Sequence, residues 1–338
     1  DSPDGVTVDL SQVNADGEVT ASDGWGGTDT LISIEDVKGS HNADTLTGSD
    51  GDNDFEGLAG DDYIDGGDGR DDVSYWNSPE GVTVDLSSAN ESGEVTVSDG
   101  WGDTDTLVSI ERVGGSNYGD DVLTGTDADN SLSGRAGDDQ LFGLGGNDWL
   151  RGDAGDDIID GGDGSEDTAV YQYDPAGVDI DLSDAVDGVL TVTDGYGDTD
   201  TLIDIERLVG TSHDDILRGD AGDNSLRGYA GDDILDGGDG DRDAVDYYHA
   251  PDGVTVDLSS ANADGEVTAS DGWGDTDTLI SIERIYAGAG DDVLTGDGAD
   301  NTFKGREGDD HLIGLGGGDW LEGGAGNDII DGGEGNDY

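Results

Sequence analysis

Aspartate residues recur in this chain at fixed distances from glycines, in the nine-residue pattern Gly-Gly-x-Gly-x-Asp-x-hydrophobic-x. Residues 57–65, 66–74 and 323–331 all show it, and we count 20 such nonapeptides, some degenerate and the last truncated. Glycine permits the left-handed backbone of a tight turn, and the Asp places a hard oxygen donor on that turn. All-oxygen ligation favours calcium over zinc or copper, and the strict octahedral geometry of magnesium suits carbonyl-rich turns poorly.

The last three residues of each nonapeptide predict a short strand. One apolar side chain stands between two polar ones, as in a strand with one buried face. Many such strands at a short, regular spacing predict an all-β solenoid, and no segment has a convincing helical pattern. The glycine-rich turns would then present their aspartates along the edges of the sheets.

The uninterrupted blocks of nonapeptides resemble the RTX (repeats-in-toxin) family of secreted bacterial proteins, as in the repeat regions of large adhesins and surface proteins. The resemblance implies a right-handed parallel β-roll, which is an elongated all-β rod with calcium-binding turns. It also implies that each calcium lies between two turns on the same edge. The sixth-position Asp carboxylates and the turn carbonyls would coordinate the ion.

Carried over residue by residue, the resemblance implies sixteen carboxylate ligands: Asp44, Asp62, Asp71, Asp121, Asp139, Asp148, Asp157, Asp167, Asp215, Asp233, Asp243, Asp292, Asp310, Asp319, Asp328 and Asp337. A lone Asp-Gly would be read as a turn former that bonds its own backbone, but sixteen in phase with glycines favour calcium. Pairing of turns predicts about a dozen ions.

Two further sets of residues are weaker candidates. The second nonapeptide of every block has a neutral amide at the ligand position, which should bind calcium more weakly or hold the turn without metal: Asn53, Asn130, Asn224 and Asn301. The segments between blocks each contain one aspartate in a turn-like context that could add a site: Asp29, Asp105, Asp200 and Asp277.

The charge of the chain limits its partners. Lys and Arg number 12 against 84 Asp and Glu, which gives a net charge of −72. Nucleic acid is excluded as a partner because phosphate binding needs cationic residues, and direct membrane insertion is excluded because no apolar run approaches ~20 residues. Low hydrophobicity with high charge is typical of disorder. We therefore expect the chain to be disordered without calcium and ordered with it.

A longer repeat lies above the nonapeptides. Similar segments begin at Val6, Val82, Val178 and Val254, with spacings of 76, 96 and 76 residues. This predicts one continuous solenoid of two super-repeats: residues 1–172 (short unit 1–76, long unit 77–172) and 173–338 (short unit 173–248, long unit 249–338). We expect the chain to be part of a longer array, and we expect the linkers of about 40 residues to form wider coils of the solenoid.

The aromatic residues have two interpretations. One linker position is always aromatic, and another aromatic position occurs in the long units: Trp25, Trp101, Tyr196 and Trp273, then Trp149 and Trp320. These rings either pack over the small-residue wall of the solenoid or form platforms for sugar rings. No Ser-His-Asp arrangement, carboxylate pair in a cleft or phosphate loop stands out, so an enzyme is not expected.

We therefore expect a calcium-binding structural repeat of a secreted protein at the cell surface or in the extracellular matrix, such as an adhesin stalk, a filament or a surface layer. Its partners would be neighbouring repeats or copies of itself, end to end or side by side, with surface glycans as a further candidate. Two alternatives remain open. One is a carbohydrate-binding or ligand-binding module that uses the linker Trp and Tyr residues. The other is the RTX secretion tail of an exported hydrolase.

Overall fold

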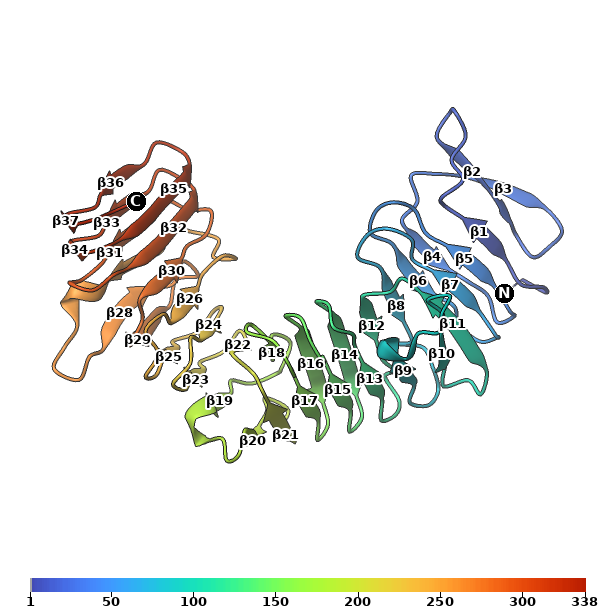
Figure 1. The fold of residues 1–338 in the computed structure, drawn as a ribbon, viewed down its shortest axis with the longest axis horizontal. Coiled ribbons are helices and arrows are strands. Elements are labelled where there is room, and N and C mark those ends of the chain that lie inside the picture. Colours follow the sequence, from blue (N-terminus) through green and yellow to red (C-terminus); the bar gives the residue numbers. More distant parts are fainter. Residues whose placement is uncertain (1) are drawn as a thin grey trace. The chain divides into compact units, whose positions relative to one another are not determined.

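The computed structural model describes residues 2–338, which form two compact units divided between Asp167 and Thr168. Both units consist of short strands in largely parallel sheets (Figure 1). Residues 2–338 contain no α-helix and three short 3-10 helices, η1 (Leu86–Ser88), η2 (Leu182–Asp184) and η3 (Leu258–Ser260). No helix in this range is long and apolar enough to cross a membrane. The predicted all-β parallel β-roll is confirmed.

The first unit has a long sheet and a short sheet. In the order of pairing, the long sheet consists of β3 (Thr28–Ile32), β2 (Glu18–Ser22), β1 (Thr7–Asp9), β5 (Thr45–Thr47), β7 (Tyr63–Asp65), β11 (Thr104–Val108), β10 (Val95–Ser98), β9 (Thr83–Asp85), β13 (Val122–Thr124), β15 (Gln140–Phe142) and β17 (Ile158–Asp160). The short sheet consists of β4 (Asp36–Lys38), β6 (Asp54–Glu56), β8 (Asp72–Ser74), β12 (Arg112–Gly114), β14 (Ser131–Ala136) and β16 (Trp149–Ala154).

The second unit repeats this plan. Its long sheet consists of β19 (Asp179–Asp181), β23 (Ile216–Arg218), β25 (Ile234–Asp236), β29 (Thr276–Ile280), β28 (Val267–Ser270), β27 (Thr255–Asp257), β31 (Val293–Thr295), β33 (His311–Ile313) and β36 (Ile329–Asp331). Its short sheet consists of β18 (Thr168–Val170), β22 (Arg207–Val209), β24 (Ser225–Arg227), β26 (Ala244–Asp246), β30 (Arg284–Tyr286), β32 (Thr302–Glu307) and β35 (Trp320–Ala325). Four more strands form the hairpin β20 (Val189–Thr193) with β21 (Thr199–Ile203) and the small pair β34 (Gly316–Gly317) with β37 (Glu334–Gly335).

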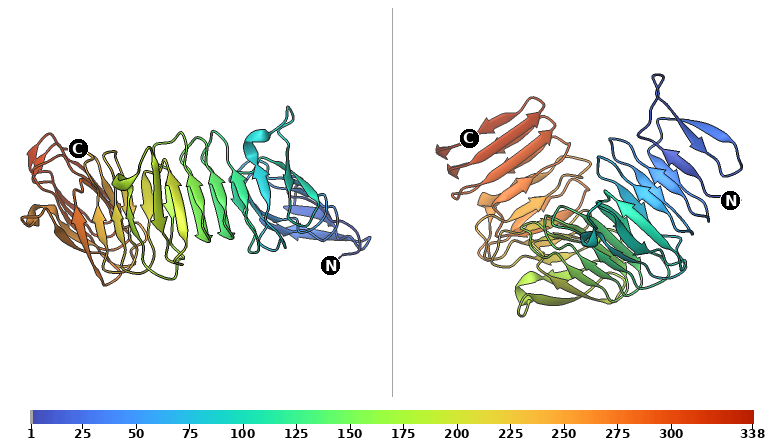
Figure 2. Two further views of the ribbon diagram at one scale, coloured as in Figure 1. Left: turned by 90° about the horizontal axis from the view of Figure 1, so that it is seen from below. Right: turned by 45° about the vertical axis from the view of Figure 1, so that its right-hand side comes forward.

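Within a block of nonapeptides the chain alternates between the two sheets. Strands of successive coils therefore lie parallel and in register, stacked one behind another as Figure 2 shows. Leu123, Leu141 and Ile159 pair across the long sheet of the first unit and are fully buried. Each strand contributes one such side chain, so the core is a pair of apolar columns between the sheets. Burial of each Leu or Ile contributes about 1.5–3 kcal/mol.

The linkers are not wider coils, and that expectation was wrong. In the first unit, the second linker forms a three-stranded meander in the long sheet, because β9 pairs antiparallel with β10 and β10 antiparallel with β11. β11 then continues parallel to β7, and β9 parallel to β13. On the opposite side, the single strand β12 bridges β8 and β14. The long sheet therefore gains two more strands here than the short sheet. β27, β28 and β29 form the same meander in the second unit.

Candidate metal sites

The sixth-position aspartates line the turns at the edges of the sheets. Fourteen of the sixteen sequence-predicted ligands are at most 2% exposed, while Asp328 and Asp337 are half-buried. The Oδ1 atom of Asp62 accepts the main-chain N–H of Asp44 at 2.7 Å, one coil of 18 residues earlier. Asp139 accepts from Asp121 in the same way, at 2.7 Å. These bonds arrange the carboxylates in columns along each edge.

Some of the turns are closed around their carboxylate or amide. In a closed turn, the second residue of the nonapeptide donates its main-chain N–H to the sixth. Thr211 N lies 2.6 Å from Asp215 Oδ2, and the Thr211 hydroxyl lies 3.1 Å from Oδ1 of the same residue. The second residues of closed turns are Ser40, Ser49, Ser116, Thr126, Thr211, Asp220 and Asp297. All of them belong to the first two nonapeptides of a block. In each closed turn, the sixth-position side chain therefore already accepts a hydrogen bond from its own turn.

The later turns of each block are open. Among residues 2–338, twelve nonapeptides have a left-handed second residue: Leu58, Gly67, Arg135, Leu144, Asp153, Gly162, Tyr229, Gly238, Arg306, Leu315, Gly324 and Gly333. We call a turn with a left-handed second residue open. The Oδ2 atom is buried with no hydrogen-bond partner at Asp62, Asp71, Asp139, Asp148, Asp233, Asp243, Asp310 and Asp319. A buried, unpaired carboxylate oxygen is costly unless something compensates it.

The first glycine of the nonapeptide makes room for this oxygen. A Cβ atom built on Gly134 would lie 2.2 Å from Asp139 Oδ2, and one built on Gly57 would lie 2.3 Å from Asp62 Oδ2. Neither glycine has a positive φ angle. Glycine is therefore needed at these two positions to leave space for the carboxylate, and not to allow a left-handed backbone.

Burial raises the pKa of open-turn aspartates such as Asp62 and Asp71, and neighbouring carboxylates add to the rise. The pKa reaches about 8 for Asp62, Asp139 and Asp233. It reaches about 6 for Asp71 and Asp148. A cation at the free oxygen would favour the ionised form and so reverse the shift.

These oxygens fit a hard divalent cation. Across residues 2–338, no three Asp, Glu or His side chains converge closely enough to hold a metal by themselves. The other ligands would therefore be main-chain carbonyl oxygens of the glycine-rich turns. Calcium accepts six to eight oxygen ligands of mixed type in flexible geometry, which suits such a donor set.

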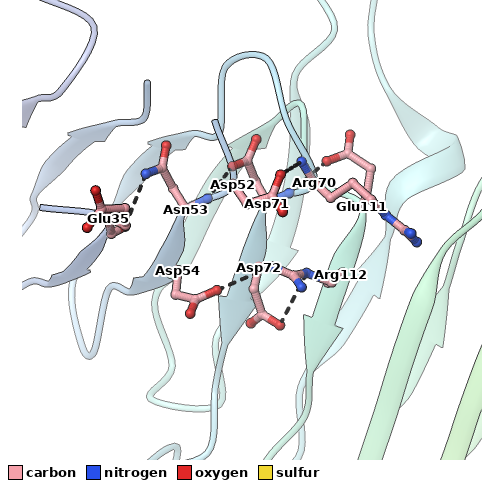
Figure 3. A network of polar contacts seen from close by, with 9 residues as sticks. All are labelled: Glu35, Asp52, Asn53, Asp54, Arg70, Asp71, Asp72, Glu111 and Arg112. Atoms are coloured by element: carbon pink, nitrogen blue, oxygen red, sulfur yellow. Dashed lines mark hydrogen bonds and ion pairs between the residues drawn. The ribbon is translucent and has the colours of Figure 1, made fainter. Parts of the chain in front are cut away.

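The four asparagines lie in closed turns and make contacts that need no cation. Asn53 Oδ1 accepts the Ser49 N–H at 2.6 Å, and its Nδ2 group donates to the carbonyl of Glu35 at 3.1 Å (Figure 3). Asn130 donates to Glu111 in the same way, at 3.1 Å. The amide N–H therefore faces a carbonyl of the preceding coil.

Replacement of Asn130 by Asp tests this role. The ionised carboxylate could not donate to the Glu111 carbonyl, so two acceptors would face each other. We expect a loss of about 1–3 kcal/mol in the free energy of unfolding, measured by urea denaturation in saturating calcium, with no gain in bound ions. Asn147→Asp makes the same charge change at an exposed position and serves as the control. A stabilised Asn130→Asp protein with an additional ion would contradict the closed-turn interpretation.

Two of the four linker aspartates continue the carboxylate columns. Asp62 N–H donates to Asp105 Oδ1 at 3.0 Å, and Asp233 N–H donates to Asp277 Oδ1 at 3.1 Å. Both linker residues are buried, as is Asp200. Asp29 is exposed, and no nonapeptide precedes it in this chain. The third strand of the linker meander, β11 or β29, thus continues the column of the previous block.

Sequence reasoning missed two linker glutamates on the other edge. Asp71 N–H donates to Glu111 Oε2 at 3.0 Å, and Asp243 N–H donates to Glu283 Oε2 at 3.0 Å (Figure 3 shows the first). Each glutamate follows its linker aspartate by six residues, as do Glu35 and Glu206. This fixed distance from the linker aspartate was the feature of the sequence that could have identified the glutamates.

A second missed group lies in the hairpin turns of the linkers. Asp99 and Asp271 are fully buried. The Oδ1 atom of Asp99 accepts the N–H groups of Trp101 and Asp103, while its Oδ2 atom has no hydrogen-bond partner. Asp194 has the same arrangement. The Asp-Gly-Trp/Tyr-Gly sequence marks this position in every linker.

The linker aromatic residues do not share one environment. Trp25 is 72% exposed, whereas Trp101 and Trp273 are half-buried. The Trp101 ring packs edge-on against His41, with centroids 5.4 Å apart, and the Trp273 ring packs against Tyr229 at 5.9 Å. These contacts fit packing against the roll better than a uniform row of sugar platforms.

Comparison with known proteins agrees with this geometry. The family described as RTX calcium-binding nonapeptide repeat (4 copies) matches residues 39–73, 116–150, 137–165, 209–242, 277–312 and 304–338. The matches cover more than half of the chain, which therefore belongs to this family. It is a calcium-binding repeat protein with a parallel β-roll fold. No curated protein matches the chain.

Proposed function

We propose that the chain is a non-enzymatic structural repeat that folds on calcium outside the cell, as part of a secreted surface or extracellular-matrix protein. The observation that carries the proposal is the set of twelve open turns with left-handed second residues. Each would hold about one calcium ion, giving about a dozen. The buried carboxylates in these turns are compatible with a folded state chiefly when a cation compensates them.

The mechanism is metal-coupled folding. With little calcium, a net charge of −72 opposes compaction and keeps the chain extended. In millimolar calcium, binding free energy becomes folding free energy. Twelve calcium ions would compensate only 24 of the 72 excess negative charges. The remaining charge favours partners that bring further cations, such as divalent ions bridging neighbouring copies side by side or end to end.

A calcium titration followed by far-UV circular dichroism tests the proposal. The coil-to-β transition should have its midpoint near the ~10⁻⁴–10⁻³ M affinities of extracellular calcium modules, and magnesium should not replace calcium. Electron microscopy of the end point would reveal ordered rods or filaments. A midpoint below about 10⁻⁶ M would contradict the proposal, because the chain would then fold before export.

A further inference from the structure

The outer face of the short sheet in the first unit is hollowed. One open cavity of about 380 Å³ lies over β4, β6 and β8. A second, of about 140 Å³, lies over β12, β14 and β16, and Asp72 lines both. Figure 3 shows Asp72 and Asp54 with Arg112 at the middle of the face.

The smaller cavity collects cationic groups in a chain that has few of them. Arg135 and Arg151 both line it, although Lys and Arg number only 12 in 338 residues. Arg151 donates to the Ser133 hydroxyl at 2.8 Å and pairs with Asp153 at 3.0 Å. The Nε atom of Arg135 is buried and has no hydrogen-bond partner. Burial lowers the pKa of Arg135 and the charge of Arg151 lowers it further, while Asp153 and Asp72 act in the opposite direction.

Arg135 also occupies a backbone conformation that disfavours it. Its φ angle is +85°, in the left-handed region that non-glycine residues disfavour. Glycine stands at the same place in other open turns, for example at Gly67 and Gly162. The arginine is thus held in a strained position where the turn itself requires no side chain.

The second unit has a tyrosine at the place that corresponds to Gly114. Gly114 lines the smaller cavity, and it pairs with Ser133 across β12 and β14. The residue in register at the equivalent place is Tyr286, which pairs with Lys304 across β30 and β32. Lys304 Nζ lies 5.2 Å from the centre of the Tyr286 ring. In the first unit the guanidinium group of Arg135 lies beside Gly114 instead, because a Cβ atom built on this glycine would be 3.3 Å from a terminal nitrogen of Arg135.

The rest of the lining suits a sugar. Ser131 and Ser133 offer hydroxyl groups, and Trp149 offers a half-buried aromatic surface. A volume of 140 Å³ equals roughly four or five waters at about 30 Å³ each, which is room for one anionic group and the carbons attached to it. The acidic surroundings would repel a dense polyanion. A ligand with a single acidic residue fits this electrostatic setting.

We propose that the Arg135 cavity binds one acidic sugar residue, with its carboxylate or sulfate between Arg135 and Arg151 and its ring beside Trp149. The anion would accept hydrogen bonds from the terminal nitrogens of Arg135 and Arg151, in competition with Asp72, which also lines the cavity, and with Asp153, which pairs with Arg151. Charge-assisted hydrogen bonds to arginine are strong. Arg135 is also the second residue of the open turn of Asp139, so the number of bound calcium ions is counted for each variant to separate loss of the sugar from loss of calcium.

The test uses the calcium-loaded chain and methyl β-glucuronide, with the Arg Nε–Hε signals of a ¹⁵N-correlation spectrum as the readout. We expect the glucuronide to shift the Arg135 signal saturably. Two variants should weaken binding at least tenfold: Arg135→Gly, which removes the charge, and Gly114→Tyr, which fills the cavity. Arg306→Gly in the second unit removes the same charge at another left-handed residue (φ +83°) and should leave binding unchanged.

The stability of Arg135→Gly separates a binding role from a structural one. Because glycine relieves the left-handed strain, the variant should melt at a higher temperature than the parent chain while it loses the ligand. No saturable shift, or binding that survives both Arg135→Gly and Gly114→Tyr, would overturn the proposal. If methyl β-glucoside bound equally well, the claim that the sugar must be acidic would be wrong. If acetate or sulfate bound equally well, the claim that the ligand is a sugar would be wrong.

Discussion

In the absence of calcium, the protein is expected to be least folded near pH 8 and to gain β-structure as the pH falls toward 5. Burial raises the pKa of Asp62, Asp139 and Asp233 to about 8 in the folded state, against an ordinary value of 3.8. A carboxyl group with a raised folded pKa stabilises the fold fully only below the unfolded pKa. That stability is lost as the pH rises through the folded pKa, here between about pH 4 and pH 8.

The effect should be large because many groups act together. Each pKa unit corresponds to about 1.4 kcal/mol, so these carboxylates oppose folding at pH 8 by an amount comparable to the net stability of a typical domain, about 5–15 kcal/mol. Far-UV circular dichroism in chelator at pH 5 and pH 8 measures this. Equal folding at both values would show that the carboxylates are not buried as described.

Saturating calcium should invert the pH dependence. The bound ion requires the ionised carboxylate, so calcium stabilises most at pH 8 and protons compete with it as the pH falls. Calcium addition to weakly buffered protein near pH 6 should accordingly release protons, which a pH electrode detects directly. Magnesium at the same concentration is the control for general charge screening.

Gly134→Ala is expected to destroy the open turn at Asp139. The added Cβ would lie 2.2 Å from Asp139 Oδ2 and 2.7 Å from its Cγ, so the carboxylate must move or the coil must open. Overpacking alone costs about 1–3 kcal/mol, and the displaced carboxylate should also lose its calcium. Calorimetric titration should count about one ion fewer, with a lower midpoint in urea.

Gly298→Ala is the matched control. A Cβ atom on Gly298 would meet no atom within 4 Å, and neither glycine has a positive φ angle. The two variants therefore differ in space and not in backbone strain. If both lose the same stability and both keep the full number of ions, the first glycine does not serve to accommodate the carboxylate.

The nonapeptide pattern predicts most of the fold because each of its positions has one dominant physical role. Ile64 alternates with polar neighbours and is fully buried. Asp62 follows the turn glycines, and its carboxylate lies buried at the edge. A fixed period then repeats these local results through the chain.

The linkers were harder to predict because the sequences of their strands do not show whether neighbouring strands pair parallel or antiparallel. Val95 and Val97 alternate with polar residues, as any half-buried strand does, and this alternation is the same whether the next strand is parallel or antiparallel. The open and closed turns could likewise not be told apart from the sequence, since they differ in the φ angle of the second residue. Ser or Thr at the second position marked most closed turns, but Asp occurs in both kinds, at Asp220 and Asp153.

The meander β9–β10–β11 also determines the direction in which the chain re-enters the coil. It reverses direction twice, so β9 runs the same way as β7 and the coil can resume with its glycines in phase. It also makes one sheet longer by two strands, or about 10 Å at ~4.8 Å per strand, across sheets about 10 Å apart. The direction in which coils stack must therefore turn at that point.

In the first unit, the meanders β1–β3 and β9–β11 both lie in the long sheet, because the four nonapeptides between them make two complete coils. With an odd number of nonapeptides, the next meander would lie in the opposite sheet. The stacking direction of the coils would then bend in the opposite sense. The number of nonapeptides in a block thus sets where the next meander lies. An even number returns the meander to the same sheet, and a single inserted or deleted nonapeptide would move it to the opposite sheet.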